Sequence, residues 1–75
     1  MYRMTDEEKA LLEKHFRFHP PKPYQITRYN KIRDYAQTLA AMLLEACPPS
    51  RERSLALTAL EEAVMWANAS IARNE

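Results

Sequence analysis

The sequence predicts an all-α protein, in which a short N-terminal helix is followed by a long antiparallel helical hairpin. The chain of 75 residues contains no glycine, which argues against a protein built from tight β-hairpins. Apolar side chains recur at steps of three and four residues through two long segments, and this is the period of an amphipathic helix. Pro48-Pro49 separates the two segments, so the second is expected to fold back along the first.

The first expected helix begins after Thr5, which stands three residues before Glu8 in the spacing of a capping box. It is short and carries Leu11, Leu12 and Phe16. Three prolines in residues 16–23 then suppress helix, and this extended stretch displays aromatic, basic and imidazole groups. We interpret it as a recognition strap.

The second helix is predicted to begin near Tyr24 or Gln25 and to end at about Cys47. Its apolar stripe contains Tyr29, Ile32, Ala36, Leu39, Leu43 and Ala46. Ser50 is a suitable N-cap for the third helix, whose stripe contains Leu57, Leu60, Val64, Ala67 and Ile71. The whole chain, residues 1–75, is read as one domain, with the N-terminal helix and strap in residues 1–22 and the hairpin in residues 23–75.

The third helix has more apolar surface than a hairpin needs. Small residues form a second stripe beside the first, made of Ala56, Ala59, Ala63, Ala67 and Ser70. Trp66 and Leu55 extend this surface, and tryptophan is enriched at interface hot spots. Since a chain of this length buries little apolar area alone, we expect a homo-oligomer with Ala59, Ala63 and Trp66 in the interface.

Composition limits the possible functions. The 11 Lys and Arg nearly balance the 10 Asp and Glu, which argues against a protein that coats long nucleic acid. No apolar run approaches a membrane span, the N-terminus lacks the apolar core of a signal peptide, and the single Cys47 fits a reducing compartment. We therefore expect a cytoplasmic protein without a membrane partner.

The candidates for catalysis or metal binding are weak. The absence of glycine removes the common phosphate-binding loops and nucleophile elbows, and no cofactor is predicted. His15 and His19 have the spacing of a helical metal pair, but prolines follow and no third ligand is evident. Glu61 and Glu62 point about 100° apart on a helix. Cys47 is interpreted as a packed thiol, so neither a catalytic nor a metal site is predicted.

A stronger cluster surrounds the start of the second helix. Its aromatic, imidazole and cationic members are Phe18, His19, Lys22, Arg28, Lys31 and Arg33. Ordinary surface charges would explain the cationic members. In the functional interpretation, Phe18 stacks on a nucleobase while the basic residues bind a phosphodiester. A second polar group, at the start of the third helix, contains Ser50, Arg51, Ser54 and Thr58, although capping alone explains Ser50.

Several motifs resemble the helical hairpin of phage anti-CBASS sponges, which is shared with anti-Thoeris sponges. The resemblance covers residues 16–74. The N-terminal motifs are Phe16-Arg17-Phe18-His19-Pro20-Pro21 and Gln25-x-x-Arg28-Tyr29-x-x-Ile32-Arg33. The C-terminal motifs are more specific: Cys47-Pro48-Pro49-Ser50-Arg51-Glu52-x-Ser54-Leu55-Ala56-Leu57-Thr58 and Glu61-Glu62-Ala63-Val64-Met65-Trp66-Ala67-Asn68-Ala69-Ser70-Ile71-Ala72-Arg73-Asn74.

The resemblance implies a non-catalytic sponge, a hexamer in that family, whose pockets form between protomers. Its ligands would be the cyclic dinucleotides and cyclic trinucleotides of antiphage signalling in the cytoplasm of the infected bacterial host. Phe18 matches the stacking ring, often tyrosine in the family, but lacks the hydroxyl. The implied ligand-binding residues are Phe18, His19, Arg28, Lys31, Arg33, Ser54 and Thr58.

Two other classes of function stay open at this point. One is a helical adaptor that binds a host protein through its alanine stripe. The other, less favoured, is a phosphodiesterase of the same messengers that would use His15, His19 and a glutamate.

Overall fold

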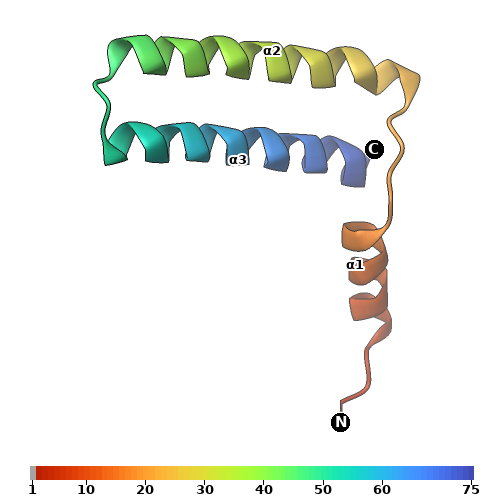
Figure 1. Cartoon of the computed structure of the whole chain (residues 1–75). Coiled ribbons are helices and arrows are strands. Elements are labelled where there is room, and N and C mark those ends of the chain that lie inside the picture. Colours follow the sequence, from red (N-terminus) through yellow and green to blue (C-terminus); the bar gives the residue numbers. More distant parts are fainter. Residues whose placement is uncertain (1) are drawn as a thin grey trace.

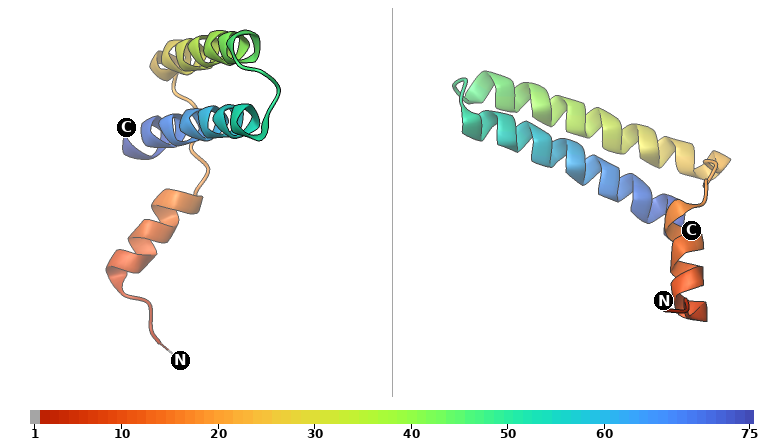
Figure 2. Two further views of the ribbon diagram at one scale, coloured as in Figure 1. Left: turned by 90° about the vertical axis from the view of Figure 1, so that its left-hand side faces the viewer. Right: turned by 60° about the horizontal axis from the view of Figure 1, so that its bottom comes forward.

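The computed structural model describes residues 2–75, and α-helix is the only regular secondary structure in that range. Helix α1 covers Asp6–Phe16, α2 covers Pro23–Ala46 and α3 covers Arg51–Asn74. Helices α2 and α3 lie side by side and antiparallel, while α1 extends away from the end of the hairpin where α2 begins and α3 ends (Figures 1 and 2). The predicted all-α hairpin with a short N-terminal helix is confirmed.

The predicted capping box starts α1. The Thr5 hydroxyl accepts a hydrogen bond from the Glu8 N–H at 3.1 Å, and the Glu8 carboxylate accepts one from the Thr5 N–H at 2.9 Å. Acidic side chains in the first turn and Lys14 and His15 in the last complement the helix dipole. No side chain of α1 is buried, so local signals rather than core packing define this helix.

Helix α2 begins at Pro23, slightly before the predicted start at Tyr24 or Gln25. Proline fits the first helical position because its missing N–H would have no partner there. The Gln25 side-chain oxygen accepts a hydrogen bond from the Lys22 N–H at 3.0 Å, which satisfies a group just outside the helix. The helix starts at the boundary that the sequence places between strap and hairpin.

The connection between α2 and α3 is held by Ser50 and Arg53. Ser50 caps α3 as predicted, with its hydroxyl accepting from the Arg53 N–H at 3.1 Å. The Arg53 guanidinium donates to the carbonyl oxygens of Leu44 and Cys47, both at 3.2 Å. These carbonyls at the end of α2 have no partner inside the helix, so Arg53 closes the turn by satisfying them.

The seam between α2 and α3 is only half-buried. Every predicted seam residue of α3 is half-buried, from Leu57 to Ile71. In α2, the predicted Leu39 and Ala46 are exposed, whereas Ala40 and Cys47 take their places. The steps from residue 36 to 40, 43 and 47 follow the α-helical repeat toward α3, while residues 39 and 46 each point about 100° away from their neighbours 40 and 47.

The single chain has no closed hydrophobic core. Within residues 2–75 no hydrophobic side chain is fully buried, and the only buried side chain is that of Gln25. Large apolar groups lie exposed on all three helices, including Leu12, Tyr35 and Trp66. The principal extents of 51 × 37 × 13 Å describe a flat molecule, one helix layer thick. Such a molecule has much apolar surface left for a partner to cover.

Candidate ligand-binding site

Four polar residues meet where α2 begins and α3 ends, at the end of the hairpin nearest α1 (Figure 1). The Arg28 guanidinium donates two hydrogen bonds to the Glu75 carboxylate, at 2.7 Å to Oε2 and 2.5 Å to Oε1. The Lys22 ammonium donates to the Glu75 main-chain oxygen at 2.8 Å. The buried Gln25 amide donates to Glu75 Oε1 at 3.4 Å. Three donors from the start of α2 thus converge on residue 75.

The charges of this cluster stabilise one another. Hydrogen bonding to Arg28 lowers the pKa of Glu75 below the usual range of a glutamate, against a smaller opposing effect of desolvation. The same hydrogen bond raises the pKa of Arg28, which is charged at all ordinary pH values. The pair therefore contributes stability above the usual pKa of a glutamate, and this contribution is lost as the pH falls through the lowered pKa. Both side chains are partly exposed, so the contribution is small.

A hollow of about 280 Å³ lies between the strap, the start of α2 and the end of α3. Its lining combines an aromatic ring, cations and the buried amide: Arg17, Phe18, His19, Pro20, Lys22, Gln25, Ala72 and Glu75. The Phe18 side chain is 79% exposed, so its ring is free to stack on a flat ring system. The hollow can hold an anionic group beside a nucleobase.

His19 joins this hollow to a second one. The His19 ring lines both, and the second, of about 290 Å³, is also lined by Pro21, Ile26, Tyr29, Asn30 and Arg33. The His19 Nε2 lies 2.8 Å from the Lys14 carbonyl oxygen. Because a carbonyl oxygen only accepts, Nε2 carries the proton. This contact fixes the strap against the end of α1.

The remaining predicted ligand residues lie elsewhere. Lys31 is exposed on α2 and lines neither hollow. Ser54 and Thr58 are exposed in the first two turns of α3, near the opposite end of the hairpin (Figure 1). One chain therefore brings together Phe18 and His19 and places Arg28 and Arg33 on the adjoining turns of α2, but it does not bring Ser54 or Thr58 to them. Their role as ligand residues stays a prediction.

The predicted interface residues lie on exposed surface of the single chain. Ala59 and Ala63 are exposed on α3, and the Trp66 side chain is 62% exposed. The Trp66 indole N–H donates to the Glu62 carboxylate at 3.3 Å, and the ring borders a polar hollow beneath the end of α1. Their role in an interface stays a prediction.

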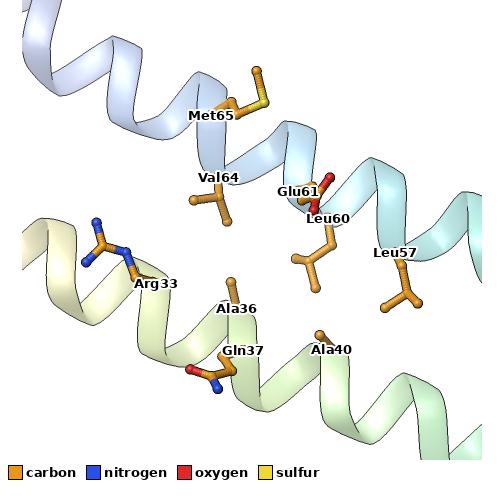
Figure 3. Close-up of a pocket in the computed structure, with 9 residues that line it drawn as sticks. All are labelled: Arg33, Ala36, Gln37, Ala40, Leu57, Leu60, Glu61, Val64 and Met65. Carbon is orange, nitrogen blue, oxygen red and sulfur yellow. The ribbon is translucent and has the colours of Figure 1, made fainter.

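A larger hollow of about 440 Å³ runs along the seam (Figure 3). The side chains of Leu57, Leu60 and Val64 point toward Ala36 and Ala40 across it (Figure 3). Only Arg33 brings a cation to its lining, so its chemistry suits apolar side chains rather than phosphate.

The phosphodiesterase alternative would require metal or acid–base groups around the two histidines. His19 uses Nε2 against Lys14, and His15 offers its main-chain oxygen to Arg73 at 3.2 Å. Across residues 2–75, no three His, Cys, Asp or Glu side chains come together as a metal-binding group. Likewise, none of the helices in this range has the length and apolar character that crossing a membrane requires.

A helical hairpin with an exposed aromatic ring and several cations at one end has the groups that a binding module for ring-bearing anions needs. The family model described as Acb2/Tad1, hairpin domain, matches residues 8–72. The chain belongs to this family, the anti-CBASS and anti-Thoeris sponges. At the level of the family, membership implies that cyclic oligonucleotides are sequestered by binding rather than by catalysis. Comparison with curated proteins and with solved structures gave no match.

Sequence reasoning did not include Gln25 or Glu75 among the site residues. Gln25 stands three residues after Lys22, the spacing of a capping interaction, and this signal was available. Glu75 gave no local signal, since it lies 47 residues from Arg28 and reaches it only because α3 returns antiparallel to α2.

Proposed function

We propose that this protein binds cyclic dinucleotides and cyclic trinucleotides without cleaving them, and so lowers the free messenger in the cytoplasm of an infected bacterial host. The observation that carries the proposal is the convergence of the exposed Phe18 ring with Lys22 and the buried Gln25 at one hollow, next to Arg28. An aromatic face and charge-assisted donors are what a nucleobase and a phosphodiester need. Membership of the sponge family supports the class of ligand.

The size of the hollow supports pockets that are completed by a second protomer. Ligand pockets typically have volumes of roughly 300–1,000 Å³. The hollow of about 280 Å³ in one chain suits part of a cyclic dinucleotide rather than the whole molecule. Together with the absence of buried apolar side chains in residues 2–75, this favours a homo-oligomer, and we propose the hexamer of the family. Ser54 and Thr58 of a neighbouring protomer would then be candidates to complete a pocket.

The proposed function predicts that a bound messenger is recovered unchanged. Cyclic di-AMP and cyclic tri-AMP would each be incubated with excess protein, removed from free solution by binding, and released by heat denaturation. We expect chromatography and mass spectrometry of the released material to show the intact cyclic compound, because sequestration needs no bond cleavage. Linear products would instead support the phosphodiesterase. Failure of the protein to retain either compound would contradict the proposed function.

Replacing Phe18 by alanine is expected to weaken binding of these compounds about 5- to 150-fold. Base–aromatic stacking contributes about 1–3 kcal/mol per base, and about 1.4 kcal/mol corresponds to a tenfold change in affinity. Titration calorimetry of the wild-type protein and the variant measures the difference. Phe16→Ala is a matched control, because Phe16 is 80% exposed but does not line the Phe18 hollow. Equal affinities of Phe18→Ala and wild type would remove Phe18 from the site.

The helical adaptor is the second candidate, and the exposed face of Ala59, Ala63 and Trp66 favours it. The two candidates differ in what covers this face. If the face is buried in a stable homo-oligomer, it is not available to a host protein. Thermal stabilisation by cyclic oligonucleotides would favour the sponge, because a ligand that binds only the folded state raises its melting temperature.

A further inference from the structure

The contacts of Glu75 have the pattern of an anion in a binding site. Its carboxylate takes two parallel hydrogen bonds from Arg28, and a phosphodiester presents two terminal oxygens to the same guanidinium fork. The Gln25 amide and the Lys22 ammonium also donate to the same residue. Every one of these contacts comes from a donor, and two of the three donors are cations.

One donor of this set, the Gln25 amide, is held in place without help from Glu75. The Gln25 side chain is 2% exposed, and its amide oxygen is bound to the Lys22 N–H at 3.0 Å. That bond orients the amide so that its N–H₂ group faces the position of the carboxylate. Lys22, the N-cap of α2, and Arg28 flank Gln25 in the sequence at the same end of the helix. The sequence of α2 therefore builds an anion cradle, which we define as Lys22, Gln25 and Arg28.

The contacts that hold Glu75 in this cradle are exposed enough to be exchanged. The Glu75 side chain can rotate away from Arg28 without breaking a backbone hydrogen bond. Its carboxylate and Arg28 keep 33% and 45% of their side-chain surfaces exposed, so water can replace each partner. Residue 75 also lies outside the residues that the family model matches.

We propose that Glu75 is a built-in competitor that sets the affinity of the site, because a ligand phosphate must displace its carboxylate from the anion cradle. This inference rests on the proposed function, since it requires a phosphodiester ligand at Arg28. It places Lys22 and Gln25, together with Arg28, at the ligand phosphate and gives Glu75 an opposing role. The affinity for the messenger then depends on how much more tightly the anion cradle binds the ligand phosphate than the Glu75 carboxylate. It does not depend on the attraction of Arg28 alone.

The test is the affinity of Glu75→Gln and Glu75→Ala for cyclic di-AMP and cyclic tri-AMP, measured by calorimetry on the full chain. We expect both variants to bind at least one compound about two- to fivefold more tightly than wild type. This factor follows from the modest strength of an exposed ion pair. Glu45→Gln is the matched control, because it removes the same charge from an exposed residue in the last turn of α2, at the other end of the hairpin.

The outcomes separate this inference from the proposed function. If wild type binds and both Glu75 variants bind equally or more weakly, Glu75 does not compete, and only this inference is overturned. If Glu45→Gln tightens binding by the same factor, net charge explains the gain, and the inference is again overturned. If no form of the protein binds either compound, while circular dichroism and light scattering show unchanged helix and size, both proposals fail.

Discussion

Replacing Trp66 by alanine is expected to break the proposed homo-oligomer into smaller species at micromolar concentration. Trp66 is 62% exposed in the single chain and lies on the same helix as the exposed Ala59 and Ala63. Small residues let a second helix approach closely, and the indole then supplies a large apolar contact. Truncation of an interface hot spot costs about 2 kcal/mol or more, which weakens each contact about 30-fold.

The lack of a core makes this effect large. Within residues 2–75 no hydrophobic side chain is fully buried, so a partner chain would have to provide much of the apolar burial that stabilises the fold. We therefore expect Trp66→Ala also to lower the melting temperature, and to lower it further on dilution, because dissociation then precedes unfolding.

Light scattering and sedimentation over a range of concentrations measure the change in mass. Tyr2→Ala is a suitable control, since Tyr2 is 99% exposed and lies before α1, away from the α3 face. An unchanged mass of Trp66→Ala at every concentration would refute the assignment of this face to the interface. The adaptor would then become the better explanation of the exposed surface.

Replacing Arg28 by glutamine is expected to weaken binding of cyclic di-AMP or cyclic tri-AMP about 10- to 100-fold. Hydrogen bonds to charged groups contribute about 1.5–3 kcal/mol, and the substitution removes both the charge and the fork of donors. A second effect adds to the loss. Glu75 would keep its negative charge without its main partner, next to the position where we place the phosphate.

A double-mutant cycle separates these two effects. If Glu75 competes with the ligand, Arg28→Gln combined with Glu75→Gln should recover part of the lost affinity, and the two changes should not be additive. Lys9→Gln is the control for loss of a positive charge, because Lys9 is exposed on α1 and lines neither hollow of the strap. Arg28→Gln that binds as tightly as wild type would remove Arg28 from the site.

The elements of the fold could be predicted because their signals are local. Thr5 with Glu8, Pro23 and Ser50 each mark a helix start through groups no more than three residues away. The apolar period of α3 placed its seam correctly. The seam of α2 was less clear, since this helix carries apolar residues at both Leu39 and Ala40, and only packing against α3 selects between them.

The candidate site could be predicted only in part. Phe18, Arg28 and Arg33 were identified by residue type and by motifs, and the structure places them on the strap and the adjoining turns of α2. Ser54 and Thr58 share a motif with the family but lie near the other end of a hairpin of two 24-residue helices. A sequence pattern does not show whether residues from opposite ends of the hairpin meet in one pocket between two protomers, because that depends on how the chains pack together.

By itself, the sequence determined the class of this protein, since helix periods, caps and the Pro48-Pro49 break are encoded in neighbouring residues. The tertiary structure alone decided which charges meet. The return of α3 brings Glu75 to Arg28 across 47 positions of the chain. The Arg28 guanidinium, which local motifs predict to be a free cation, is therefore paired with a carboxylate. Electrostatic partners are set by distance in space, and a helical hairpin makes the most distant residues of its two arms neighbours.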